Sequence, residues 1–174
     1  RNAHAMRALV IGGTGPTGPG VVQGLLDRGY EVAIYHRGQH EVAELPAVQQ
    51  HLHGNADDPD QLRRDFGHTE WDVVCAMYGR SGRAEDLFAG RCGRFIYISG
   101  QGGYTRPGRL PFPAGRGLPI KEDHPRNVAR GDGSGYASLV AECEQRVMAH
   151  HAMGHYSATV FVYTSLYGPR APRH

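Results

Sequence analysis

A glycine-rich segment near the start of the chain has the spacing of an anion-binding turn. Gly12, Gly15 and Gly18 recur every three residues in the sequence GGTGPTG, between an apolar run at 7–11 and a helical pattern at 19–28. In such a turn the glycines permit a tight bend, close approach of a diphosphate and close packing of the next helix, whose N-terminus faces the anion. We expect the whole turn to bind the diphosphate of a dinucleotide, through Gly12, Gly13, Thr14, Gly15, Pro16, Thr17 and Gly18.

Two basic side chains at the end of the second expected strand bear on which dinucleotide binds. An acidic residue about 20 residues beyond the glycines would bind the ribose hydroxyls of NAD. The chain has His36 and Arg37 there, and the first acid that follows is Glu41. Because a guanidinium pairs in bidentate fashion with a phosphate, these residues favour NADP. NAD stays the alternative, with Arg37 then a solvated residue at a strand end.

Apolar runs and helical patterns alternate along the chain, which indicates the architecture. Strands are expected at 7–11, 31–35, 48–53, 71–77, 94–99 and 157–163, and helices at 19–28, 57–66 and 136–151, with weaker helical segments near 40–46 and 83–91. Asp58 should cap the 57–66 helix, and Phe66 and Trp71 should lie in the core. Strands alternating with helices pair in parallel through right-handed crossovers. The fold class should be α/β, a doubly wound parallel sheet of the Rossmann type.

The length of 174 residues allows one domain with a single core. Residues 1–5 are interpreted as a possible tag remnant, 6–169 as a dinucleotide-binding domain and 170–174 as a tail. The stretch from Gly100 to Gly133 is rich in Gly, Pro and Arg without periodicity. Such a long aperiodic connection, here 100–133, is typical of a binding loop or a disordered segment.

Net charge, hydropathy and cysteine spacing limit the classes of binding partner that we expect for the chain. The net charge is only +2 and the arginines are scattered, so a nucleic-acid partner is not expected. No apolar run approaches the roughly 18 residues of a membrane span. Three cysteines without a CxxC pair favour reduced thiols and a cytoplasmic location. The expected partner is a small-molecule substrate, and a homodimer is compatible with the sequence.

Five segments together resemble the NAD-dependent epimerase/dehydratase family, within the extended and atypical short-chain dehydrogenases/reductases. They are GGTGPTG at 12–18, GNADDPDQL at 54–62, FIYIS at 95–99, the YxxxK-like helix from Tyr136, and TSLYGP at 164–169. The resemblance implies the N-terminal, cofactor-binding portion of such an enzyme. The C-terminal substrate domain of the family is expected to be missing, as in a fragment or a cofactor-binding module.

The resemblance also implies cofactor contacts beyond the glycine turn. Asn55 and Ala56 would lie near the adenine, and Ala76 and Met77 beneath the adenosine ribose. The nicotinamide would lie near residues 164–166, including Thr164 and Ser165, and Tyr163 just before them is a further expected cofactor contact.

For catalysis, the resemblance implies Tyr136 as the acid/base, with Ser99 assisting by orienting the substrate. In the family a lysine four residues after the tyrosine shares its helix face and favours the phenolate. This chain has Val140 there, Gly100 at the second serine position, and Val162 where many relatives carry arginine. Lys121 is the single lysine in the chain.

Two functions therefore stay open. The first is an NAD(P)-dependent oxidoreductase or epimerase/dehydratase-like enzyme that acts by hydride transfer on a small molecule bearing a hydroxyl or carbonyl group, such as a sugar nucleotide. The second is a non-catalytic dinucleotide-binding sensor, a scaffold or an RNA-binding relative, favoured by Val140 and Gly100. No metal site is expected, because the histidines at 150, 151 and 155 sit at a helix C-terminus, where the helix dipole favours them.

Overall fold

A computed structural model describes residues 5–77, 83–100, 135–163, 166 and 168. Six strands alternate with four helices in this part of the chain. The elements are β1 (Arg7–Ile11), α1 (Gly18–Leu26), β2 (Glu31–His36), β3 (Gln50–His53), α2 (Pro59–Phe66), β4 (Trp71–Ala76), α3 (Ala84–Leu87), β5 (Cys92–Gly100), α4 (Tyr136–Ala152) and β6 (Ser157–Tyr163).

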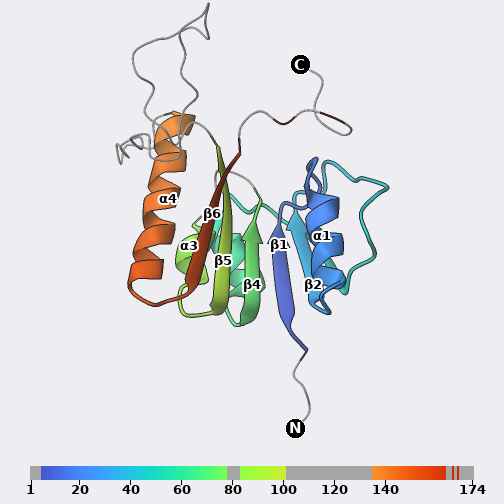
Figure 1. Cartoon of the computed structure of the whole chain (residues 1–174), viewed down its shortest axis with the longest axis horizontal. Helices are drawn as coiled ribbons and strands as arrows, with labels where there is room; N and C mark the ends of the chain where they lie inside the picture. The colour runs from blue at the N-terminus through green and yellow to red at the C-terminus, as the bar shows by residue number, and fades with distance from the viewer. Residues whose placement is uncertain (1–4, 78–82, 101–134, 164–165, 167, 169–174) are drawn as a thin grey trace, which may run out of the picture.

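The six strands form one parallel sheet in the order β3-β2-β1-β4-β5-β6. The strand order reverses direction between β1 and β4, so the carboxyl ends of these two strands flank the switch point where ligands bind in open α/β sheets. The labelled strand arrows in Figure 1 point the same way, toward the edge of the sheet where the glycine turn follows β1. The doubly wound parallel sheet predicted from the sequence is confirmed.

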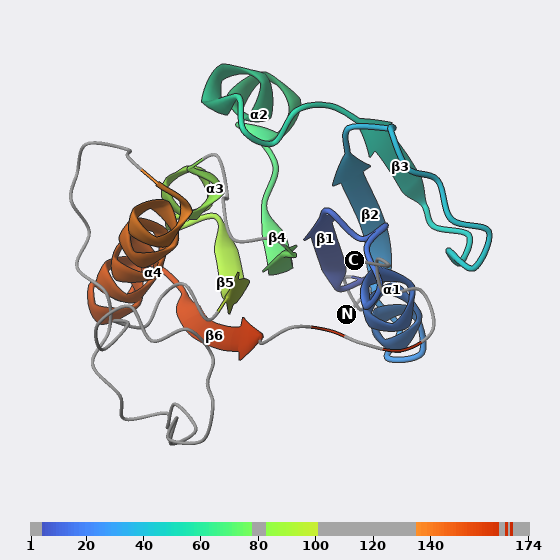
Figure 2. The same ribbon diagram turned by 90° about the horizontal axis from the view of Figure 1, so that it is seen from above.

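Helices cover both faces of the sheet, as Figure 2 shows: α1 lies on one face, and α2, α3 and α4 lie on the other. Each strand contributes alternate side chains to the two cores. In β1, Leu9 and Ile11 join the larger cluster under α2–α4, whereas Ala8 and Val10 join the smaller one under α1. Phe66 and Trp71 are buried in the larger cluster, as predicted from their size and apolar character.

The weaker sequence patterns gave the less accurate predictions. No helix forms at 40–46, where the backbone makes only a turn with the Leu45 N–H bonded to the Val42 carbonyl at 3.1 Å. Pro46 disfavours helical geometry in the residue before it, and the segment is too short to offset the cost of helix nucleation. Strand β3 begins at Gln50 instead of 48, and the helix expected within 83–91 is limited to α3.

The start of α2 follows its capping chemistry. Asp58 accepts hydrogen bonds from the backbone N–H groups of Asp60 and Gln61, at 3.0 and 3.1 Å. This cap satisfies two of the unpaired amides of the first turn. None of the helices in the described ranges is long and apolar enough to cross a bilayer.

A buried ion pair joins α3 to α4. The Glu85 carboxylate is fully buried and accepts a hydrogen bond from Arg146 Nε at 2.7 Å. Arg146 also binds Glu142, one helical turn earlier on α4. Since a guanidinium bridges two carboxylates here, the pair holds the C-terminal half of α4 against α3.

We predict that Arg146→Leu lowers the free energy of unfolding by about 3–5 kcal/mol, because a buried carboxylate loses its cation. Arg63→Leu is the matched control: Arg63 pairs with Asp60 on an exposed helix surface, with side chains 66% and 75% exposed. Such a pair contributes at most about 1 kcal/mol. Urea unfolding of the two variants measures the difference, and equal losses would contradict the structural role of Arg146.

Candidate functional site

The glycine turn links β1 to α1. Its backbone conformation would be strained if another residue type replaced Gly12 or Gly13. Gly12 and Gly13 have φ angles of 105° and 71°, a region that L side chains rarely adopt. The Gly12 N–H bonds the Tyr35 carbonyl of β2 at 2.9 Å, and the Thr14 N–H bonds the Gly12 carbonyl at the same distance. The chain thereby reverses at the carboxyl edge of the sheet, where the turn was predicted.

The third glycine of the repeat permits the closest contact in the turn. A Cβ on Gly18 would lie 1.9 Å from the Gly13 carbonyl oxygen, a distance that no side chain can occupy. Glycine at 18 therefore lets the first turn of α1 pack directly on the loop. The N-terminus of α1 thereby adjoins the turn, and the positive end of its dipole favours an anion there.

A cleft of about 340 Å³ runs from this turn across the carboxyl ends of the strands. One wall is the whole predicted turn, residues 12–18. The remaining lining residues come from the ends of β2, β4, β5 and β6 and from the segments that follow β2, β3 and β6: His36, Arg37, Gln39, His40, Gly54, Asp57, Met77, Ile98, Tyr163 and Leu166. The cleft thus joins segments that are far apart in the sequence.

The end of β2 brings both predicted basic residues to the cleft. Arg37 is exposed and lines the cleft, so its guanidinium is available to an anion. The neighbouring His36 is buried, and burial lowers its pKa, which favours the neutral ring. Its Nε2 lies 2.6 Å from Nε2 of His51, so the His36 ring points toward β3.

Three other predicted cofactor residues are not among those that line the cleft. The Asn55 side chain accepts a hydrogen bond from the Asp57 N–H at 3.1 Å, and Ala56 and Ala76 are buried. Gly54 and Asp57 line the cleft at this point instead. Thr164 and Ser165 lie outside the described residues.

Several lining residues were missed from the sequence. Gln39 and His40 belong to no motif, whereas Gly54, Asp57 and Ile98 lie in the GNADDPDQL and FIYIS segments but were not assigned to the cofactor. Their one shared signal is position, because each lies at or shortly after the carboxyl end of a strand. The register of the parallel sheet, which the sequence does not state, decides which of them face the cleft.

Tyr136 occupies the first turn of α4 and is 56% exposed. Its hydroxyl oxygen lies 3.6 Å from the position that a Cβ on Gly100 would take, at the end of β5. The structure therefore brings Tyr136 and Gly100 together, as expected if position 100 matches the second serine of the family motif. A serine side chain there would sit beside the phenol without a steric clash.

The other predicted catalytic positions face the protein interior. Ser99 is 3% exposed, and its hydroxyl donates a hydrogen bond to the Glu144 carboxylate of α4. Val140, one turn after Tyr136, is fully buried. The structure holds the Ser99 hydroxyl against α4, and its role in orienting the substrate stays a prediction.

The cysteines offer no reactive nucleophile to the cleft. Cys75, Cys92 and Cys143 are all buried. Burial raises the pKa of Cys75 and of Cys92 to about 12, because the thiolate would lose its hydration. Thiols in such surroundings are inert at neutral pH.

Comparison with known proteins gave matches only among solved structures. No protein-family model matches the sequence, and no curated protein matches it. The structure superposes on UDP-glucose 4-epimerase from Thermus thermophilus, a complex with NAD, with a TM-score of 0.71 and 20% identity over 97% of this chain. The likeness shows the fold.

Two further structures have the same fold. One is dTDP-glucose 4,6-dehydratase from Bacillus anthracis in complex with NAD, with a TM-score of 0.64, 18% identity and 95% of this chain covered. The other is UDP-glucose 4-epimerase from Thermotoga maritima with UDP-glucose, with a TM-score of 0.69, 18% identity and 95% covered. This chain spans 57–58% of the length of these three proteins.

The space beside Gly15 gives a test of the cleft. Among the described residues, no atom outside its own neighbourhood lies within 4 Å of a Cβ on Gly15, and the same holds for Gly20 on α1. Gly15→Ala should therefore fold normally. If a dinucleotide binds at the turn, the variant should weaken its binding about tenfold or more, because the methyl would occupy space that the diphosphate needs.

Gly20→Ala is the matched control, because Gly20 is not one of the residues that line the cleft. Fluorescence titration with NADPH measures affinity, and thermal melting verifies folding. Equal affinities for the two variants would contradict the placement of the diphosphate at Gly15.

Proposed function

We propose that this chain binds a nicotinamide dinucleotide and takes part in hydride transfer at a hydroxyl-bearing or carbonyl carbon, as an NAD(P)-dependent oxidoreductase or an epimerase/dehydratase-like enzyme. The observation that carries the proposal is the cleft, which begins at the glycine turn and continues along the strand ends to Tyr163. A turn that excludes a Cβ at Gly18 and leaves space at Gly15 fits a diphosphate.

The residues that would hold the cofactor follow from this path. The diphosphate would bind the turn and the N-terminus of α1. The adenosine end would extend toward Arg37 and His40, and the nicotinamide end toward Ile98 and Tyr163, all of which line the cleft.

The preference for NADP over NAD rests on Arg37. No acidic residue stands between His36 and His40, where the family would bind the ribose hydroxyls of NAD through a carboxylate. The exposed guanidinium of Arg37 lines the cleft, where a 2′-phosphate would need a cation. Two of the similar structures were obtained with NAD, so NAD is the alternative ligand.

In the proposed reaction Tyr136 moves the proton. The bound nicotinamide supplies or accepts the hydride. During reduction, the Tyr136 hydroxyl donates its proton to the oxygen of the substrate carbonyl, and in the reverse direction its phenolate accepts the proton of the substrate hydroxyl. The exposure of Tyr136 and the small residue beside it at Gly100 leave room for a substrate oxygen.

Sugar nucleotides are one substrate class that fits this proposal. The similar structures include enzymes named for UDP-glucose and dTDP-glucose. The buried thiols also suit a reducing compartment such as the cytoplasm.

A second candidate function is a non-catalytic dinucleotide-binding sensor or scaffold. Two observations favour it: Val140 is fully buried where the family has its lysine, and the Ser99 hydroxyl is bonded to Glu144. The first removes the cation that would favour the Tyr136 phenolate, and the second engages the hydroxyl that would orient the substrate. This function predicts dinucleotide binding without turnover.

Exchange of one charge at the end of β2 tests the cofactor preference. Arg37→Asp should weaken NADPH binding by about 10- to 100-fold, since hydrogen bonds to a charged group contribute about 1.5–3 kcal/mol. NADH binding should change much less. Arg64→Asp, an exposed arginine of α2 outside the cleft, is the control for net charge. If Arg37→Asp weakens NADH and NADPH equally, the assignment to NADP is wrong.

Replacement of the phenol tests catalysis itself. Tyr136→Phe should lower NADPH-dependent reduction of carbonyl substrates by about 100-fold or more while NADPH affinity is unchanged, because only the proton donor is lost. A wild-type chain that binds NADPH without turnover would support the non-catalytic function instead.

Gly100→Ser is the complementary variant. Its hydroxyl would lie beside the Tyr136 phenol without a clash, so the rate should rise. Val140→Lys is a poorer choice, because it would bury an ammonium group and destabilise the fold.

A further inference from the structure

Three histidines gather on one face of the sheet edge because of the parallel register. His36 of β2 is paired with His53 of β3, so their side chains project from the same face. His51 lies two residues before His53 on β3 and therefore shares that face. The sequence shows two histidines two residues apart, at 51 and 53. Only the strand register shows that His36 of β2 lies beside them.

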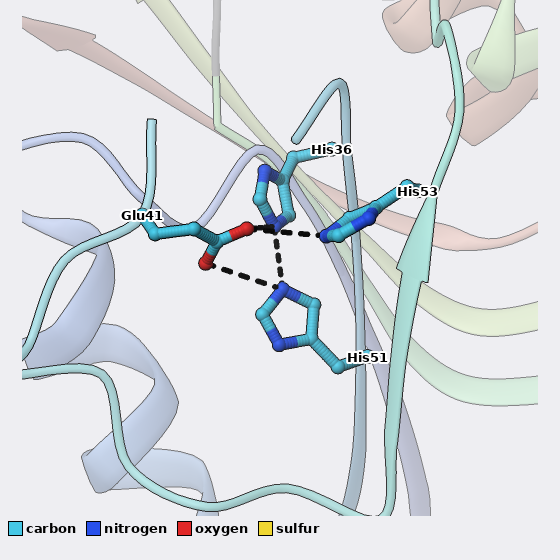
Figure 3. A group of neighbouring side chains, drawn as sticks. All are labelled: His36, Glu41, His51 and His53. Carbon is cyan, nitrogen blue, oxygen red and sulfur yellow. Dashed lines mark hydrogen bonds and ion pairs between the residues drawn. The ribbon is translucent and has the colours of Figure 1, made fainter. Parts of the chain in front are cut away.

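Glu41 completes the group from the segment between β2 and β3. Figure 3 shows its carboxylate pointing at the three imidazole rings. Its Oε1 lies 3.1 Å from Nε2 of His53 and 3.6 Å from Nε2 of His36, and its Oε2 lies 3.7 Å from Nε2 of His51. One carboxylate thus faces three ring nitrogens, and we call these four residues the histidine cluster.

The spacing of these atoms suits a small metal ion. One ligand atom from each of the four residues lies within 4.8 Å of all the others. In a tetrahedral site with metal–ligand bonds of about 2.0–2.1 Å, ligand atoms are about 3.4 Å apart. The distances from His36 to His51 and from Glu41 to each histidine run from 2.6 to 3.7 Å and bracket this value.

We propose that the histidine cluster binds one divalent transition-metal ion, with zinc favoured, through His51, His53 and Glu41 and with His36 as fourth ligand. Imidazole nitrogens and a carboxylate are ligands that zinc takes in proteins. The side chains of Glu41 and His53 are 51% and 56% exposed, so an ion can enter from solvent.

The environment of His36 sets the order in which the ligands engage. The Gly38 N–H donates a hydrogen bond to Nδ1 of His36 at 3.1 Å, so the neutral ring carries its proton on Nε2. Binding a metal through Nε2 requires this proton to move to Nδ1 and the Gly38 bond to break. His51 needs no such change, because its Nε2 accepts the proton of His36. His53 releases the Nε2 proton that it donates to Glu41, but its ring is exposed and is not held by the backbone. His51, His53 and Glu41 therefore form the primary set.

The cluster adjoins the cleft without being part of the phosphate-binding turn. His36 lines the cleft, whereas Glu41, His51 and His53 are not among its lining residues. Metal binding is therefore separable from dinucleotide binding, and its test does not depend on the proposed enzyme activity.

Titration of the chelator-treated chain with Zn²⁺ tests the proposal by isothermal calorimetry. The wild type should bind one ion at the cluster, and the double variant His51→Gln/His53→Gln should lose at least about tenfold in affinity, as expected when direct ligands are removed. His36→Gln should lose less. Added Zn²⁺ should raise the melting temperature of the wild type but not of the double variant.

His150→Gln is the matched control. His150 belongs to another group of ligand-type residues, with its Nδ1 2.8 Å from Nδ1 of His155 and its Nε2 2.9 Å from the Asp86 carboxylate. This variant should bind Zn²⁺ as the wild type does. Unchanged affinity in the double variant, or an equal loss in His150→Gln, would overturn the proposal.

A check of the fold and a second variant show whether misfolding causes a loss of Zn²⁺ binding. Every residue of β3 is exposed, so the metal-free double variant should keep the circular dichroism and melting temperature of the wild type. Glu41→Gln removes the carboxylate without changing a strand, and it should also weaken Zn²⁺ binding.

The Co²⁺-loaded wild type should show the visible absorption of a tetrahedral ion, and an octahedral spectrum would contradict the four-ligand site.

Discussion

The contact between the loop and the first helix is the constraint on which the rest of the structure depends. The Gly13 carbonyl lies so close to Gly18 that a Cβ there would be 1.9 Å away. This contact places the start of α1, and with it the positive end of the helix dipole, beside the loop that follows β1. The parallel sheet then brings the ends of β2, β4, β5 and β6 to the same edge, and together they form the cleft.

Much of this arrangement could be predicted from the sequence, because strong local signals agree with the global fold. The buried strands read as continuous apolar runs, and Asp58 capped its helix as its side chain allows. The weak helical pattern near 40–46 did not form a helix, since Pro46 and short length outweigh its few apolar residues. The three histidines of the cluster could not be grouped in advance, because their proximity depends on the β2–β3 register.

The predicted catalytic residues separate into two environments. Tyr136 is exposed beside Gly100 at the end of β5, as a proton donor requires. Ser99 and Val140 face inward, where packing against the sheet determines their surroundings. A residue pattern such as YxxxK specifies a helix face, but the sequence alone does not state which part of that face the sheet covers. Dinucleotide binding and catalysis are thus supported by different parts of the structure, the first by the cleft and the second by Tyr136.

Hydrogen–deuterium exchange with and without saturating NADPH tests the central claim, that the cleft binds a dinucleotide, most directly. Bound cofactor should slow amide exchange at 12–18 and at 36–40, the segments that form the turn and follow β2, while α2 at 59–66 exchanges at the same rate in both states. Unchanged exchange at 12–18, or protection confined to segments outside the cleft, would contradict the account.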